Sequence, residues 1–70
     1  MTAELTVRVN GEDLMLPRGA SVSQLLERLR ISTPRVAVER NCEILPKAAY
    51  SSTLLQEGDV FEVVEFVGGG

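Results

Sequence analysis

The chain has 70 residues, 44% of them hydrophobic, so it can bury one small core and is expected to form a single compact domain. A formal net charge of −3 lacks the positive potential that dominates nucleic-acid binding, so nucleic acid is not an expected partner. The sequence has no histidine and one cysteine, Cys42, which excludes a histidine-based triad, an iron–sulfur cluster and an internal disulfide.

The first segment has the pattern of a β-hairpin. Apolar Leu5, Val7 and Val9 alternate with polar residues, which is the period of a strand with one buried face. Asn10-Gly11 suits the positive φ angles of a tight turn, so a second strand is expected over residues 13–16. Residues 17–19, which begin with a proline, are expected to end it.

A helix is predicted next, from Val22 to Leu29. Ser21 is placed as its N-cap, and Gln24, three residues later, completes a capping box. Apolar residues recur on one helical face, so the helix should pack on a sheet through Val22, Leu25, Leu26 and Leu29. Pro34 disfavours helical geometry in the residue before it, so the helical segment should end before this proline.

The second half of the chain predicts three more strands. We expect a third strand around residues 36–38, a turn at Asn41-Cys42 and a short fourth strand at Ile44-Leu45. Residues 46–53 have no clear period and are expected to be irregular, with Tyr50 filling part of the core.

A last strand is predicted over Val60–Val67, after a turn at Gly58-Asp59. Within it Phe61 and Val63 alternate with Glu62 and are assigned to the core. This order of elements predicts an α+β fold, a roll in which a mixed sheet of four to five strands carries one helix packed across one face.

The chain lacks the groups of an active site. Cys42 has no base to activate it and is interpreted as a small, semi-buried residue at a strand end. The glycines do not form a phosphate loop, because no glycine-rich turn with a lysine joins a strand to a helix. We therefore predict a protein that is not an enzyme, with no catalytic residue, no metal and no cofactor bound by the chain.

The same features suggest a compartment. No leader segment and no apolar run long enough to cross a bilayer is recognisable, so no membrane partner is expected. Because Cys42 is unpaired, a reducing, cytoplasmic setting is predicted.

The last third of the chain is acidic. From residue 48 onward it carries Glu57, Asp59, Glu62 and Glu65 and no basic residue. This acidic patch is either a solvated face or a surface that steers the chain toward a basic partner.

The chain closes on Gly68-Gly69-Gly70. A tail without side chains can enter a channel too narrow for other residues and bring the Gly70 carboxylate to a bound nucleotide. Ordering each tail residue opposes binding by about 1–2 kcal/mol, so other contacts must supply several kcal/mol. We predict a domain over residues 1–67 and a flexible tail over residues 68–70.

Two apolar residues just before the tail are candidates for those contacts. Val64 and Phe66 are predicted to point away from the helix, and burying both in a partner would contribute about 3–6 kcal/mol. With Val67, Gly68 and Gly69 they form the predicted partner-binding segment. The alternative is a second small apolar cluster beneath residues 46–53.

These residues carry a resemblance to a known family. The Gly58-Asp59 turn, the last strand and the closing glycines are similar to the carboxyl-terminal signature of the ThiS/MoaD family of sulfur carriers, β-grasp proteins of the ubiquitin superfamily. Residues 36–47 and Tyr50 resemble the middle segment of the ThiS branch in particular. The resemblance covers nearly the whole chain, and it departs from the family in having three closing glycines rather than two.

The resemblance implies a function for Gly70. An E1-like adenylyltransferase of the ThiF/MoeB type would use ATP and magnesium to adenylate its carboxylate. A persulfide sulfur donor would then convert the adenylate to a thiocarboxylate, and thiazole synthase of the ThiG type would take the sulfur for thiamine. Two alternatives stay open: a carrier for molybdopterin or tRNA thiolation, and a non-conjugating β-grasp interaction module.

Overall fold

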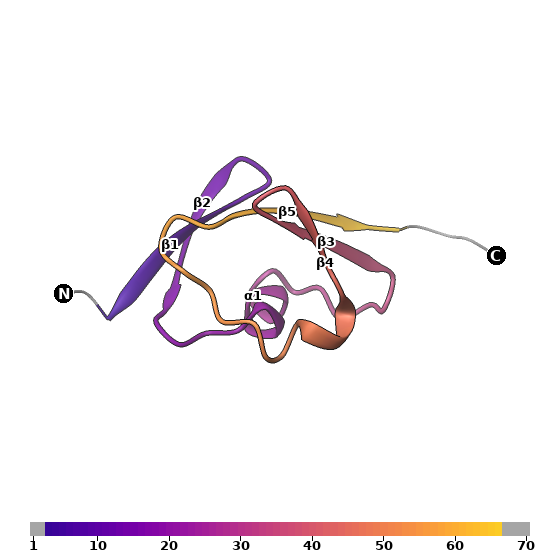
Figure 1. Cartoon of the computed structure of the whole chain (residues 1–70), viewed down its shortest axis with the longest axis horizontal. Helices are drawn as coiled ribbons and strands as arrows, with labels where there is room; N and C mark the ends of the chain where they lie inside the picture. The colour runs from indigo at the N-terminus through magenta and orange to yellow at the C-terminus, as the bar shows by residue number, and fades with distance from the viewer. Residues whose placement is uncertain (1–2, 67–70) are drawn as a thin grey trace.

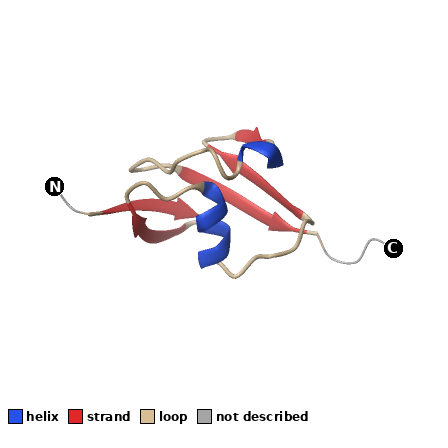
Figure 2. Cartoon of the chain, turned by 90° about the horizontal axis from the view of Figure 1, so that it is seen from below, coloured by secondary structure: helices blue, strands red, loops and turns tan. Residues whose placement is uncertain are grey.

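The computed structural model describes residues 3–66, which form a five-stranded sheet with one α-helix across one face (Figure 1; Figure 2). The sheet order is β2-β1-β5-β3-β4, with β1 and β5 parallel and the other neighbours antiparallel. The predicted α+β roll with a mixed sheet is therefore confirmed. Its elements are β1 (Glu4–Val9), β2 (Glu12–Pro17), α1 (Val22–Arg28), β3 (Val36–Arg40), β4 (Glu43–Leu45), the 3-10 helix η1 (Lys47–Ala49) and β5 (Val60–Glu65).

The first hairpin forms as its sequence predicts. Asn10 and Gly11 both have positive φ, 50° and 86°, as the tight turn requires. Pro17, however, does not break β2 but is its last residue, opposite Glu4. The strand is an edge strand, and the next amide, that of Arg18, donates to the Ala3 carbonyl at 3.0 Å. Backbone N–H groups along a strand point alternately toward and away from the neighbouring strand, so the N–H that Pro17 lacks would have pointed away from β1. The proline therefore removes no hydrogen bond between the two strands.

The helix begins at the predicted capping box. The Gln24 N–H donates to Ser21 Oγ at 3.2 Å, and the Ser21 N–H donates to Gln24 Oε1 at 2.8 Å. These two bonds satisfy amides that have no partner inside the helix. The helix ends at Arg28 with Leu29 as its cap, and Arg30 turns the chain away at a φ of 61°.

The core lies between α1 and the sheet. Phe61 and Val63 of β5 are buried in it, as predicted, against the apolar stripe of α1 and the inward residues of β1. Tyr50 is buried in the same core, which confirms its predicted place. Burial raises the pKa of the Tyr50 hydroxyl above its usual value of 10.0, and a hydrogen bond with the Val38 backbone acts in the opposite direction.

Three local expectations are corrected by the structure. Cys42 is exposed rather than semi-buried, because it lies in the β3–β4 turn at a φ of 72°. The segment expected to be irregular contains the short helix η1. The last strand ends at Glu65 rather than at Val67, although the Phe66 N–H still donates to the Arg35 carbonyl at 2.8 Å; Val67 itself lies outside the described residues.

Candidate functional site

Two of the predicted partner-binding residues, Val64 and Phe66, lie at the surface at and just after the end of β5. Val63 points into the core, so its neighbour Val64 points to the face that α1 does not cover, which we call the outer face. Val64 is 53% exposed and Phe66 is 56% exposed. The alternative in which they pack beneath residues 46–53 is therefore wrong, because more than half of each remains open to solvent.

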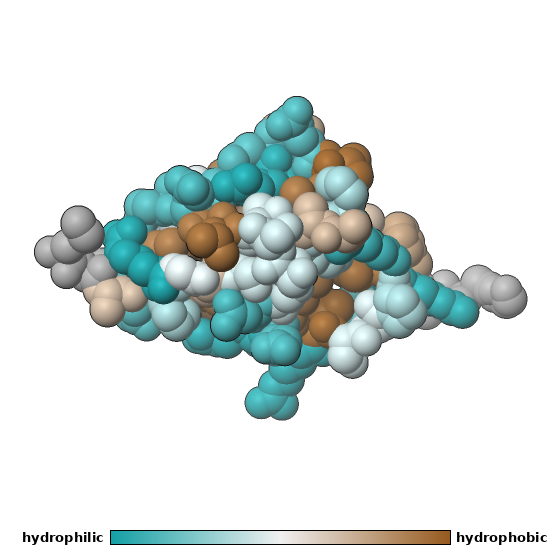
Figure 3. All heavy atoms as spheres, turned by 60° about the horizontal axis from the view of Figure 1, so that its bottom comes forward, coloured by the Kyte–Doolittle hydropathy of each residue, from teal (hydrophilic) through white to brown (hydrophobic). Residues whose placement is uncertain are grey.

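Other apolar side chains share the outer face with Val64. Val60 lies four residues earlier on β5, and Ile44 of β4 stands opposite Glu39, which is itself opposite Glu62. Val60 and Ile44 are both exposed. On the side of α1, Figure 3 shows hydrophobic patches between hydrophilic residues. The outer face thus presents exposed apolar side chains along β5 and on β4.

The start of β5 is held on its β3 side. The Asn41 N–H donates to the Val60 carbonyl at 2.7 Å, and the Val60 N–H donates to Asn41 Oδ1 at 2.9 Å. Just before Val60, the carboxylate of Asp59 accepts a hydrogen bond from Arg40 Nε at 3.0 Å. The strand that leads to the end of the chain is therefore anchored at its beginning.

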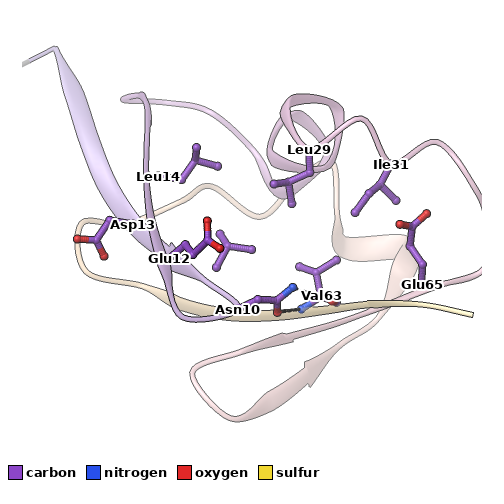
Figure 4. Close-up of a pocket in the computed structure, with 9 residues that line it drawn as sticks. Asn10, Glu12, Asp13, Leu14, Leu29, Ile31, Val63 and Glu65 are labelled. Atoms are coloured by element: carbon purple, nitrogen blue, oxygen red, sulfur yellow. Dashed lines mark hydrogen bonds between the residues drawn. The ribbon is translucent and has the colours of Figure 1, made fainter.

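A second asparagine holds β5 on its β1 side. The Asn10 N–H donates to the Phe61 carbonyl at 2.9 Å. Its side chain then makes two bonds to one residue: Oδ1 accepts from the Val63 N–H at 2.8 Å, and Nδ2 donates to the Val63 carbonyl at 3.0 Å (Figure 4). Neither asparagine stood out in the sequence except as a turn residue. The available signal was an asparagine at a left-handed turn position directly after a strand.

The acidic residues of the last third do not form the single patch that the sequence predicts. Asp59 is buried and paired with Arg40. Glu57 lies 3.8 Å from Arg18. Glu62 and Glu65 are three residues apart on a strand and so point to opposite faces of it. The predicted acidic patch is therefore wrong as a common surface.

A cleft of about 300 Å³ lies beside Val63 on the helix side of β5. Figure 4 shows the side chains of Asn10, Glu12, Leu14, Leu29, Ile31 and Glu65 around it. Its lining has carboxylates and apolar groups but no thiol or amine. Among residues 3–66, no group of three potential metal ligands is found. The cleft does not bring a catalytic set together.

No helix among residues 3–66 is long and apolar enough to cross a membrane.

The predicted tail lies beyond these groups in the sequence. Val67, Gly68, Gly69 and the predicted modification site Gly70 are outside the described residues, so their roles stay predictions. What the described part establishes is a strand held on both edges, with exposed apolar side chains at its end and one helix behind the sheet. This sheet order and single α-helix define a β-grasp, ubiquitin-like fold.

The comparisons with known proteins agree on one family. The model of the ThiS family matches residues 2–70. The sulfur carrier protein ThiS of Bacillus subtilis is 37% identical over 91% of this chain and 98% of its own length. A crystal structure of the thiamine biosynthesis protein ThiS from Geobacter metallireducens superposes with a TM-score of 0.73 at 34% identity, covering 94% of this chain and 100% of that one. The chain belongs to the ThiS family.

A further relative is much longer. The thiazole synthase of Paramagnetospirillum magneticum is 42% identical over 89% of this chain, which corresponds to 19% of the relative. The chain thus spans about a fifth of that protein's length. A segment similar to this carrier therefore occurs in a chain named as a thiazole synthase.

Proposed function

We propose that the chain carries sulfur as a thiocarboxylate on Gly70 and donates it to thiazole synthase. A carboxylate is a poor electrophile, and sulfur cannot displace its oxygen without activation. Activation is expected from an adenylyltransferase of the ThiF/MoeB type. The carboxylate oxygen attacks the α-phosphate of ATP, pyrophosphate leaves, and the magnesium of that enzyme offsets the phosphate charge.

The sulfur then enters by acyl substitution. The terminal sulfur of a persulfide donor attacks the acyl adenylate and AMP leaves. A thiol cleaves the resulting acyl disulfide, so that the thiocarboxylate is released and the donor side is left as a disulfide. ATP and magnesium are used by the partner, and this chain supplies only the acyl group, so Gly70 is a substrate position rather than a catalyst.

The observation that carries the proposal is the exposure of Val64 and Phe66, 53% and 56%, directly ahead of the closing glycines. Each residue is already nearly half buried, so burying the remainder in a partner's binding site would supply about 1.5–3 kcal/mol for the pair. Threading three tail residues would cost about 1–2 kcal/mol each. These contacts would offset about half of that cost, which supports docking through Val64, Phe66 and Val67 with Gly68 and Gly69 in the enzyme's channel, and other contacts of the complex must supply the rest. In this proposal residues 68–70 act as a tail outside a domain of residues 1–67.

Thiazole synthase as the acceptor is supported by the longer relatives. When two partners share one chain, the local concentration of one at the other is raised without any new contact. A segment similar to this carrier in chains named as thiazole synthases is expected if the two surfaces work together. The cytoplasm, where a persulfide and free thiols persist, is the setting we propose.

The requirement for a free carboxylate at Gly70 is tested by adding one residue to the end of the chain. One alanine added after Gly70 should abolish pyrophosphate exchange with the adenylyltransferase, while the midpoint of thermal unfolding stays unchanged. Exchange that survives the extension would refute activation at Gly70. Sulfur transfer is then compared between thiazole synthase and a molybdopterin-synthesising partner. Transfer to the second alone would move the carrier to the molybdopterin pathway.

A further inference from the structure

We propose that Asn10 is a positioning residue for the sulfur-carrying end, because its side-chain amide replaces a missing strand residue beside Val63. The inference rests on the proposed function of Gly70. It assigns a task in that function to a residue in the opposite half of the chain, in the turn between β1 and β2.

The pairing between β1 and β5 stops well before the end of β5. The two parallel strands share only the pairs Arg8↔Val60 and Val9↔Phe61. At Asn10 the chain turns into the hairpin, at a φ of 50°. A third residue of β1 would have offered its carbonyl to the Val63 N–H, but the turn takes the backbone away from β5. Without a substitute, the amide and carbonyl of Val63 would lose their partners on this edge.

The Asn10 side chain supplies both missing groups. An amide side chain has one carbonyl oxygen and one NH₂, the same donor and acceptor types as a peptide group. Oδ1 accepts from the Val63 N–H at 2.8 Å and Nδ2 donates to the Val63 carbonyl at 3.0 Å. Figure 4 shows the two residues facing each other at the floor of the cleft. The parallel ladder is thereby extended by one step past the end of β1.

The two Asn10–Val63 hydrogen bonds, which we call the Asn10–Val63 clamp, lie just before the end of β5. After Val63, β5 is paired only on its β3 side, through Val64, Glu65 and the Phe66 amide. Asn10 is therefore the last contact from the β1 side before the docking residues Val64 and Phe66. A strand end held from one side only would fray more readily, and ordering it again on docking would weaken affinity for the adenylyltransferase.

The chain contains a matched control for a purely structural role. Asn41 also occupies a hairpin turn, at a φ of 51°, and its side chain also makes two hydrogen bonds, to the Val60 N–H and the Asp59 carboxylate. It clamps the other end of β5, remote from Phe66. Glycine tolerates positive φ, so Asn10→Gly and Asn41→Gly each remove the side chain without straining the turn.

The test compares pyrophosphate exchange with both variants at a temperature where circular dichroism shows both folded. Asn10→Gly should raise KM for the carrier about tenfold, or about 1.4 kcal/mol. Its kcat should change less than about twofold, because Asn10 does not reach the reacting atoms. Asn41→Gly should leave both constants within about twofold. Asn10→Asp keeps an oxygen for the Val63 N–H but sets a carboxylate oxygen against the Val63 carbonyl, so it should raise KM as well.

Amide hydrogen exchange gives a second readout that does not depend on the partner. The Val63 amide should exchange at least about tenfold faster in Asn10→Gly than in wild type, and Asn41→Gly should accelerate Val60 instead. Equal KM values in the two glycine variants, or an unchanged Val63 amide in Asn10→Gly, would overturn the role of Asn10. If wild type itself showed no pyrophosphate exchange, the proposed function would fail, and the hold on Val63 would still be decided by the amide rates.

Discussion

Arg40 and Asp59 form an ion pair at the start of β5, with Nε 3.0 Å from Oδ2 and the Asp59 side chain only 7% exposed. The same carboxylate accepts from Asn41 Nδ2 at 3.1 Å and from the Gln56 N–H at 2.9 Å. Its charge is thus met by several donors from two segments. These bonds fix the Gly58-Asp59 turn against the β3–β4 hairpin. The position of this turn determines where β5 begins.

Asp59→Ala should therefore lower the free energy of unfolding by about 2–3 kcal/mol, since it removes these bonds and leaves the Arg40 guanidinium, itself partly buried, without its carboxylate. Urea denaturation followed by circular dichroism measures the change. The control is Asp13→Ala, whose pair with Arg8 is exposed, with side chains 65% and 58% accessible. That variant should lose less than about 1 kcal/mol. Equal losses would show that Asp59 is not an anchor.

Cys42 is the second residue of the β3–β4 turn and has a left-handed backbone conformation. The equivalent position of the β1–β2 turn is occupied by a glycine, Gly11. The φ of Cys42 is 72°, against 86° for Gly11, and a side chain at such an angle costs about 1–2 kcal/mol. Cys42→Gly should thus raise the free energy of unfolding by about 1 kcal/mol, since part of the relief is offset by the greater freedom of the unfolded chain.

The converse substitution is Gly11→Ala. A Cβ at Gly11 would meet no atom within 4 Å, so only the backbone angle opposes it. The variant should lose about 1 kcal/mol. If Cys42→Gly destabilises the protein, backbone strain at the second turn is not the governing term.

Tyr50 predicts a loss of stability in alkali. Burial raises the pKa of its hydroxyl above 10.0, so the folded state holds the proton more tightly than the unfolded state. This contribution is complete below about pH 10 and is lost as the pH rises through the folded pKa. Tyr50→Phe should show a shallower decline above about pH 10. Tyr50 is the sole tyrosine, so tyrosinate absorbance reports it alone. A parallel decline in both proteins would contradict the prediction.

Phe66→Ala should weaken binding to the adenylyltransferase far more than it weakens folding. The side chain is 56% exposed, so its loss should cost little in the free protein. In the proposed complex it would be buried, and its removal should reduce affinity about tenfold. Titration calorimetry and thermal melts measure the two effects. Leu54→Ala, at 52% exposure on the loop before β5, is the control and should leave affinity unchanged.

The local signals in the sequence were sufficient for most elements. Asn10-Gly11 predicted the hairpin, and the Ser21–Gln24 capping box predicted the start of the helix, because both depend on bonds between near neighbours. Alternation along β5 also separated the buried Val63 from the exposed Val64. These features needed no knowledge of the rest of the fold.

The remaining features depend on contacts between distant segments. The place of Pro17 in β2 follows from that strand being at the edge of the sheet, which its own residues do not reveal. The Asn10–Val63 clamp joins residues 53 positions apart, and the burial of Asp59 depends on Arg40 across the sheet. The sequence shows that a residue is acidic but not whether a basic residue from a distant segment pairs with it. The patch prediction failed for this reason.

The most direct test of the account is the intact mass of the carrier after incubation with ATP, magnesium, the adenylyltransferase and a persulfide donor. Formation of the thiocarboxylate should add the mass difference between sulfur and oxygen, located at Gly70 by fragmentation. An unchanged mass, under conditions in which the same enzymes thiolate the Bacillus subtilis carrier, would contradict it.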